Sequence, residues 1–137
     1  MDKNIKVRWG WIKFMYIYTI VGAGGVGLGI ILIPDVMRSI FGLPNSDQIS
    51  AFGVTGIVYL AFALLSILGL RSPLKFTPIL LLQLTYKSVW FIGVVIPLLL
   101  MVKYPAYAIL FAVIYVSYII GDLIAIPFSY VIAKQSD

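Results

Sequence analysis

The chain has 137 residues, of which 62% are hydrophobic and 11% are charged, with no cysteine and no histidine. Because soluble domains carry about a quarter charged residues, this composition excludes a soluble globular protein, and the missing residue types exclude disulfides, thiol catalysis, Cys/His metal sites and imidazole chemistry. The net charge of +5 is better explained by orientation in a membrane than by a nucleic-acid partner.

Four apolar runs follow one another along the chain, separated by charges and prolines. Each run meets the length of about 20 residues that a helix needs to cross a bilayer, and none shows the alternation of a barrel strand. The sequence therefore predicts an all-α integral membrane four-helix bundle as a single transmembrane domain. The expected spans cover residues 11–33, 48–70, 77–102 and 106–133.

The first run begins after Lys3, Lys6, Arg8 and Lys13, as a secretory signal peptide would. A signal peptide has an apolar core of about 7 to 15 residues that ends at small residues, whereas this run is longer and ends at Pro34. We therefore expect it to be retained as the first membrane helix.

Glycines crowd the middle of this first span. The segment from Gly22 to Gly27 matches the dinucleotide-binding pattern G-x-G-x-x-G, but that pattern functions only in a strand, turn and helix of a soluble βαβ unit. In a membrane helix, Gly22, Gly25 and Gly29 share one face, and the last two form a small-xxx-small pair. We expect this face to pack closely against another helix, of this chain, of a second copy or of a partner protein.

The segment after the first span is amphipathic. From residue 34 to 44, Val36, Met37 and Ile40 recur at helical spacing, and Gly42 is placed to end the helix. This pattern predicts a short helix lying at the outer membrane surface, although a plain turn between two spans is the alternative.

Basic residues are unequally divided between the two sides of the four-span arrangement. With the N-terminus in the cytoplasm, seven lie inside and two outside; the inside set is Lys3, Lys6, Arg8, Lys13, Arg71, Lys75 and Lys134, and the outside set is Arg38 and Lys103. The positive-inside rule then predicts cytoplasmic N- and C-termini in a cell inner membrane.

Two ionisable residues interrupt the apolar spans, Lys87 in the third and Asp122 in the fourth. Lys87 lies 17 residues before Tyr104, at the hairpin tip, and Asp122 lies 18 residues after it. At 1.5 Å per residue, both reach a depth of about 26 to 27 Å on neighbouring antiparallel helices. Because a charge inside a membrane is costly, the sequence predicts that the two groups pair.

Polar and aromatic residues accompany this pair at helical spacing. The third span places Gln83, Tyr86, Lys87 and Trp90 on one face, the fourth places Tyr115, Tyr118 and Asp122 on one face, and the second carries Thr55, Tyr59 and Ser66. We expect these faces to turn inward. They either stabilise the bundle, form a pocket for a lipid or lipid-soluble ligand, or conduct protons. No catalytic residue, metal site or cofactor is predicted.

The chain resembles the DoxX-like family of small four-helix membrane proteins. The resemblance is carried by the Gly-rich first helix, by Pro34-Asp35 and Phe41-Gly42-Leu43-Pro44, by Leu68-Gly69-Leu70-Arg71-Ser72-Pro73, and by Gln83-Leu84-Thr85-Tyr86-Lys87-Ser88-Val89-Trp90. It implies a prokaryotic inner-membrane bundle, in some members a partner of oxidoreductases. Since this chain has no cysteine, it has no thiol-disulfide activity of its own.

Three function classes follow from these features. An accessory or binding module is favoured. A small proton- or ion-coupled transporter acting as a dimer is the alternative, although the first span lacks the carboxylate on which small multidrug transporters depend. A membrane enzyme acting on a lipid-soluble substrate comes last, because no nucleophile and base are paired.

Overall fold

The computed structural model describes residues 6–41, 51–101 and 106–134, and within these ranges the chain is helical with no strand. The all-α prediction is confirmed. The dinucleotide pattern of residues 22–27 lies inside a helix, as expected for a membrane segment. Lys3, Lys103 and Tyr104, on which expectations above depend, lie outside the described residues.

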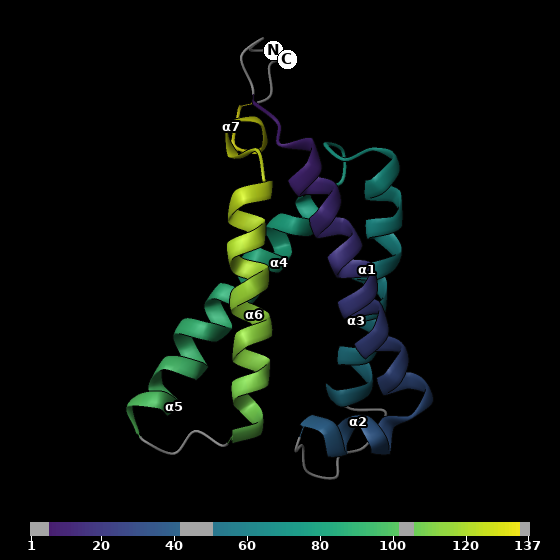
Figure 1. Ribbon diagram of the computed structural model, residues 1–137, viewed down its shortest axis with the longest axis vertical. Coiled ribbons are helices and arrows are strands. Elements are labelled where there is room, and N and C mark those ends of the chain that lie inside the picture. Colours follow the sequence, from purple (N-terminus) through teal and green to yellow (C-terminus); the bar gives the residue numbers. More distant parts are fainter. Residues whose placement is uncertain (1–5, 42–50, 102–105, 135–137) are drawn as a thin grey trace.

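Three helices are long and apolar enough to cross a membrane (Figure 1). They are α1 (Trp9–Leu32), α3 (Ala51–Arg71), and a continuous helix over Thr77–Leu100 that consists of α4 (Thr77–Trp90), the π-helical turn η1 (Phe91–Val95) and α5 (Ile96–Leu100). A fourth apolar helix, α6 (Ala106–Ala125), has 20 residues. Its exposed surface, like that of the others, is rich in aliphatic side chains. The chain is therefore built as a membrane protein.

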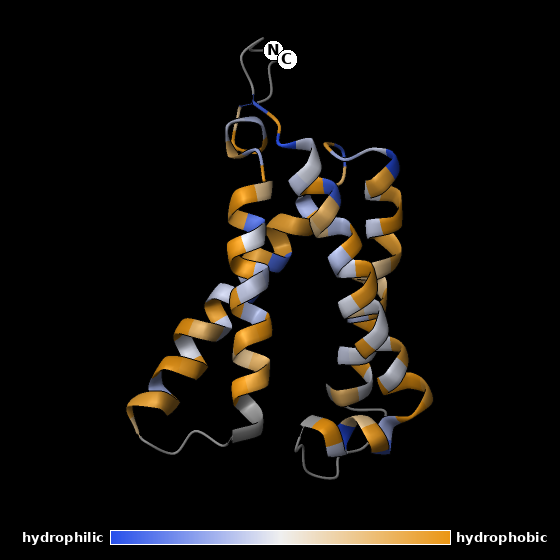
Figure 2. Ribbon diagram, viewed as in Figure 1, coloured by the Kyte–Doolittle hydropathy of each residue, from blue (hydrophilic) through white to orange (hydrophobic). Residues whose placement is uncertain are grey.

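Hydrophilic residues lie mainly toward the two ends of the bundle. They occur at the end that holds the start of α1 and the short helix α7 (Phe128–Val131) and, at the other end, on α2 (Pro34–Phe41), while hydrophobic residues cover most of the helix surface between (Figure 2). At the α7 end, Arg8 joins the start of α1 to the end of α6 by donating a hydrogen bond of 2.9 Å to the Ile124 carbonyl. The first and last helices thus meet at one end of the bundle.

The short amphipathic helix is confirmed as α2 (Pro34–Phe41). Pro34 starts it, as proline does at a first helical position, and Met37 is its buried apolar contact, packed on Ile30 and Phe52. Arg38 and Asp35 form an ion pair of 3.0 Å along it. The expected end of this helix at Gly42 lies outside the described residues.

Helices α1 and α3 pack backbone to backbone. A Cβ atom added at Gly27 would lie 2.7 Å from both the Gly56 carbonyl oxygen and the Leu60 amide nitrogen, and one added at Gly24 would lie 3.0 Å from the Ala63 Cβ. Only glycine leaves room for such an approach, which brings the two helices into extensive van der Waals contact. This pair forms one half of the bundle.

Two prolines shape the other half. Pro97 has no N–H and its ring clashes with the carbonyl four residues earlier, and the chain accommodates it by a π turn, in which the Ile96 N–H bonds to the Phe91 carbonyl. The prediction of one helix over residues 106–133 is wrong at its end. Because Pro127 cannot continue a helix and disfavours helical backbone at Ile126, α6 ends at Ala125 and the chain restarts as α7.

Candidate functional site

The interior between α4, α6 and α1 is polar. Helix α4 buries Gln83 and Lys87, and α6 buries Tyr118 and Asp122; the four residues are 0 to 3% exposed. Tyr115 is 9% exposed and Tyr86 is half-buried. The structure thus brings together the two polar faces that the sequence places on neighbouring helices.

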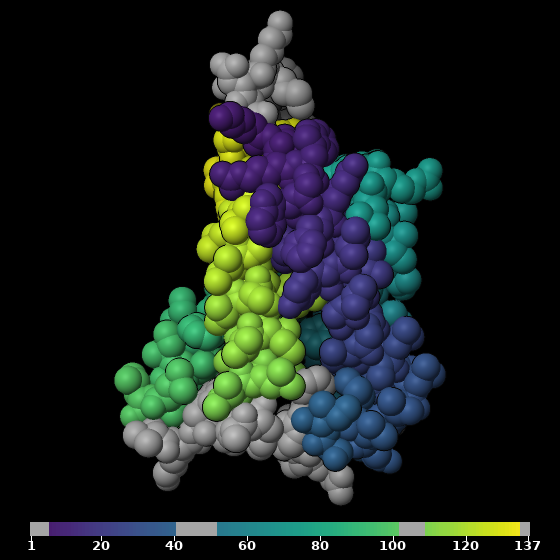
Figure 3. Space-filling model, in the orientation of Figure 1, coloured from purple at the N-terminus to yellow at the C-terminus, as the bar shows by residue number. Residues whose placement is uncertain are grey.

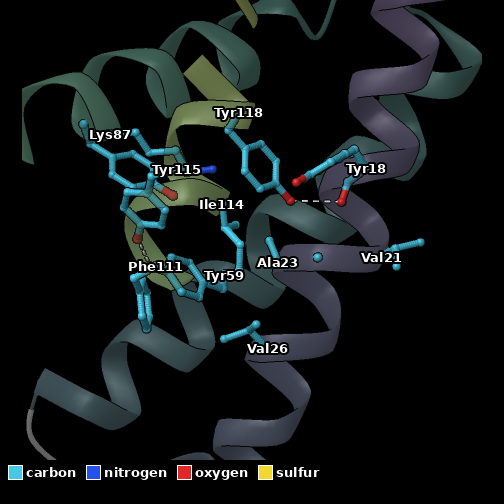
Figure 4. A pocket seen from close by; sticks show the side chains of 12 residues that line it. Tyr18, Val21, Ala23, Val26, Tyr59, Lys87, Phe111, Ile114, Tyr115 and Tyr118 are labelled. Atoms are coloured by element: carbon cyan, nitrogen blue, oxygen red, sulfur yellow. Dashed lines mark hydrogen bonds between the residues drawn. The ribbon is translucent and has the colours of Figure 1, made fainter. Parts of the chain in front are cut away.

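The Lys87 side chain ends among aromatic rings (Figure 4). Its Nζ lies 3.2 Å from the centroid of the Tyr118 ring, 5.3 Å from that of Tyr115 and 5.5 Å from that of Tyr86. An ammonium group is attracted to the negative faces of such rings, by about 2 kcal/mol when it is desolvated. The rings therefore stabilise a cation that has left water.

The expected direct pair between Lys87 and Asp122 is not formed. No atoms of the two side chains approach within 4.0 Å as an ion pair, and among the described residues neither carboxylate oxygen of Asp122 has a hydrogen-bond partner. Tyr118, one turn before Asp122 on α6, presents its ring face to the ammonium instead. The mutual dependence of Lys87 and Asp122 stays a prediction. The two charges still influence each other electrostatically across the interior.

Gln83 shares a face of α4 with Lys87, but its side chain bonds to Thr19 of α1. Its amide nitrogen lies 3.2 Å from the Thr19 hydroxyl oxygen and its carbonyl oxygen 3.3 Å from the same atom, while that hydroxyl also donates to the Met15 carbonyl at 2.8 Å. Gln83 consequently ties α4 to α1 in the buried interior.

A cavity of about 250 Å³ opens beside Lys87, on the side away from Asp122 along α6. Helix α1 contributes Tyr18, Val21, Gly22, Ala23 and Val26; α3 contributes Tyr59; α4 contributes Tyr86 and Lys87; and α6 contributes Phe111, Ile114, Tyr115 and Tyr118. On the face drawn in Figure 3, the surface is hollowed between α6 and α1. Lys87 is the charged group of this cavity.

Tyrosine hydroxyls hold the cavity walls together. Tyr118 donates to the Tyr18 carbonyl at 3.0 Å, the Tyr18 and Ser117 hydroxyls share a hydrogen bond of 2.7 Å, and the hydroxyls of Tyr59 and Tyr115 are bonded to each other. These bonds link α1 and α3 to α6. The tyrosines that join the helices by these hydrogen bonds therefore also provide the aromatic surfaces of the cavity.

The remaining predicted polar and aromatic residues do not line this cavity. Trp90 packs behind the wall, with its ring 4.8 Å from that of Tyr115. Ser66 is buried but bonds within its own helix, to the Phe62 carbonyl, and Thr55 is half-buried. Neither Ser66 nor Thr55 lines the cavity.

Sequence reasoning missed the contribution of α1 to the cavity. Tyr18 lies edge-on to the Tyr118 ring at 4.2 Å and precedes Gly22, which faces the Tyr118 hydroxyl, by one helical turn. Because residues four apart share a helix face, the spacing of Tyr18 and Gly22 was the signal in the sequence for the wall that α1 provides.

The three glycines predicted to pack together have separate neighbours. Gly22 faces Tyr118, Gly29 faces the Met37 side chain of α2, and a Cβ added at Gly25 would meet no described atom within 4 Å. Within the chain, the close helix contact runs instead through Gly24 and Gly27. A role of Gly25 in contact with a second copy or a partner protein remains a prediction.

Comparisons of the chain with protein-family models, with curated proteins and with solved structures find no match.

Proposed function

We propose that this protein crosses a prokaryotic inner membrane four times, with both termini in the cytoplasm, in the manner of the DoxX-like proteins that it resembles. The length of α6 supports a fourth span, since 20 residues extend about 30 Å, the thickness of the hydrocarbon core. The meeting of α1 and α7 at one end supports an even number of spans. Reporter fusions after Lys103 and after Asp137 should report opposite sides, and a periplasmic C-terminus would refute the arrangement.

We further propose that the protein is a binding module, whose cavity takes a lipid-soluble small molecule with an anionic or strongly accepting group. The observation that carries this proposal is the Lys87 ammonium, 2% exposed and placed at the wall of an aromatic cavity within the membrane-spanning bundle. A buried cation needs an acceptor, and the aromatic rings meet only part of that need.

The cavity also limits the ligand. Ligand pockets commonly measure about 300 to 1,000 Å³, so a volume of about 250 Å³ suits a head group or a small ring system and not a whole lipid. Tyr59, Tyr86 and Tyr115 provide flat walls that suit a planar ring. The ligand is therefore expected to place its acceptor at Lys87 and its ring between the tyrosines.

Naphthalene-2-sulfonate is a suitable probe, because it is flat and permanently anionic, and naphthalene-2-sulfonamide is its neutral counterpart. Titration calorimetry on the protein in lipid nanodiscs should show that the sulfonate binds and the sulfonamide binds about tenfold or more weakly. Lys87→Met should weaken sulfonate binding by about 10- to 100-fold, since a hydrogen bond to a charged group contributes about 1.5 to 3 kcal/mol.

The matched control is Lys13→Met, which makes the same substitution at an exposed position of α1. It should leave the affinity unchanged. Equal losses in both variants, or equal binding of the two probes, would show that the sulfonate recognises the membrane surface and not the cavity.

The transporter alternative draws support from one observation, the buried carboxylate of Asp122, which has no hydrogen-bond partner in the part of the chain that the structure describes. Membrane-embedded acids mark proton pathways in pumps and transporters. Proteoliposomes loaded with the sulfonate would separate the classes, because only a transporter releases it when a proton gradient is imposed.

A further inference from the structure

The Asp122 carboxylate lies in a closed environment. The side chain is fully buried, and among the described residues neither oxygen accepts a hydrogen bond. The titratable groups that interact with it electrostatically are Tyr16 from α1, Tyr86 and Lys87 from α4, and Tyr118 from its own helix. Of these groups, Lys87 is the cation.

Two of the neighbouring phenols already use their hydrogens elsewhere. The Tyr16 hydroxyl donates to the Pro73 carbonyl at 2.7 Å, and the Tyr118 hydroxyl donates to the Tyr18 carbonyl at 3.0 Å. Neither can stabilise a negative charge on Asp122. An ionised Asp122 therefore depends on the charge of Lys87.

Lys87 borders two regions. Its side chain lines the cavity, while its charge also acts on Asp122. A net charge in a dry interior is costly, so without a ligand the amine and the carboxyl are jointly neutral and hold one exchangeable proton between them. An anion arriving at Lys87 makes this group of three negative unless a second proton enters.

We propose that Asp122 is a proton-binding site coupled to the cavity, so that binding of an anion at Lys87 is accompanied by uptake of one proton from water. In the complex, Lys87 is an ammonium bonded to the anion and Asp122 is a neutral carboxylic acid. When the anion leaves, one proton leaves with it. This coupling rests on the proposed binding of an anion at Lys87.

The coupling has a defined direction. Because the complex holds one more proton than the free protein, binding weakens as the pH rises, by about tenfold per pH unit while uptake is complete. A permanently ionised probe is needed to see this in the protein alone. Naphthalene-2-sulfonate meets that need, since its own charge does not change with pH.

The test is calorimetric titration of the nanodisc-embedded protein with naphthalene-2-sulfonate in phosphate and in Tris, whose ionisation enthalpies differ. Wild type should take up about one proton for each bound sulfonate. Infrared spectra of wild type with ¹³C-labelled aspartate should show the band of a protonated carboxylic acid in the complex, because Asp122 then holds the second proton, and Asp122→Asn should lack that band. Asp35→Asn, the same change at an exposed carboxylate of α2, should behave as wild type.

Each outcome decides the proposal. Sulfonate binding without proton uptake in wild type overturns the coupling and leaves the proposed binding function standing, as does a protonated aspartate band that persists in Asp122→Asn. Absence of sulfonate binding overturns both. Should Asp122→Asn fail to fold, the wild-type spectrum decides alone, since the complex must show the band of a protonated aspartate, and its absence refutes the proposal.

Discussion

The two helix contacts of α1 are built on opposite principles. Toward α3 it presents glycines, and the backbones approach until no side chain fits between Gly27 and Gly56. Toward α6 it presents Tyr18 and Gly22 to the ring and hydroxyl of Tyr118, and below this contact the helices leave a cavity.

The difference separates packing from binding. Without a hydrophobic driving force between helices in a bilayer, close van der Waals contact stabilises the α1–α3 pair. On the α6 side, large rings keep the backbones apart, so polar groups and empty volume lie together. The closely packed α1–α3 pair thus forms one wall of the cavity, whose other walls come from α4 and α6.

The largest effect on stability is expected in the polar interior between α4, α6 and α1. Lys87→Met and Asp122→Asn should each lower the free energy of unfolding by about 3 to 5 kcal/mol, because each leaves the other group uncompensated in a dry interior. The double variant should recover much of this loss. Unfolding by dodecyl sulfate in mixed micelles measures all three, and strictly additive losses would show that the two groups are independent.

The stability of the closely packed α1–α3 pair should respond to a single added methyl group. Gly27→Ala places a Cβ against the backbone of α3 and should cost about 1 to 3 kcal/mol by overpacking. Gly25→Ala, two residues away, meets no described atom and should be neutral or slightly stabilising through helix propensity. Equal effects on thermal stability would contradict the assignment of the packed face.

Assembly provides a second measurement on the same face. If a second copy or a partner packs on α1 through Gly25, then Gly25→Leu should reduce the assembly size seen by native mass spectrometry while the monomer keeps its stability. An unchanged assembly would show that this side of α1 faces lipid.

A smaller effect is expected where the two halves meet. Tyr118→Phe removes the hydrogen bond to the Tyr18 carbonyl but keeps the ring under Lys87, and should cost about 1 kcal/mol. Tyr118→Leu removes the ring as well and should cost about 2 kcal/mol more. Thermal unfolding of both variants therefore separates the bond from the ring, and equal losses would deny the ring any role.

The smallest effect belongs to the end of the bundle. Arg8→Gln removes the bond to the Ile124 carbonyl at an exposed site and should lower the stability by about 0.5 kcal/mol. Lys6→Gln, a nearby exposed change of the same charge, is the control. A loss of stability above that of the control shows that this hydrogen bond joins the start of α1 to the end of α6.

Local rules predicted much of this structure. The helix type, the amphipathic α2 and the grouping of Lys87 with Tyr118 and Asp122 all depend on spacing within a segment or on depth in the bilayer, which the sequence carries directly. Pro97 and Pro127 also signal the π turn in the third span and the end of α6, but the uninterrupted hydropathy around them favoured regular, unbroken helices.

Contacts between helices were less predictable. Apolar or small residues surround most of α1, so the sequence does not indicate that Gly24 and Gly27, and not Gly25, face α3. In the same way, matching depth predicts that Lys87 and Asp122 approach each other but not that a neighbouring ring takes the ammonium. Which residues of a helix contact its neighbour depends on the rotation of one helix against the other. The sequence of a single segment does not determine that rotation.

The π turn at Phe91–Val95 has a consequence for insertions and deletions. It is equivalent to one extra residue in an α-helix, and one residue turns a helix by about 100°. Deleting a single residue between Phe91 and Val95, together with Pro97→Leu, should therefore restore a regular helix without rotating α4 relative to α5. The same deletion in the regular turn around Leu81 would rotate Lys87 away from Tyr118. Tolerance to a missing residue is thus confined to one turn of the third span.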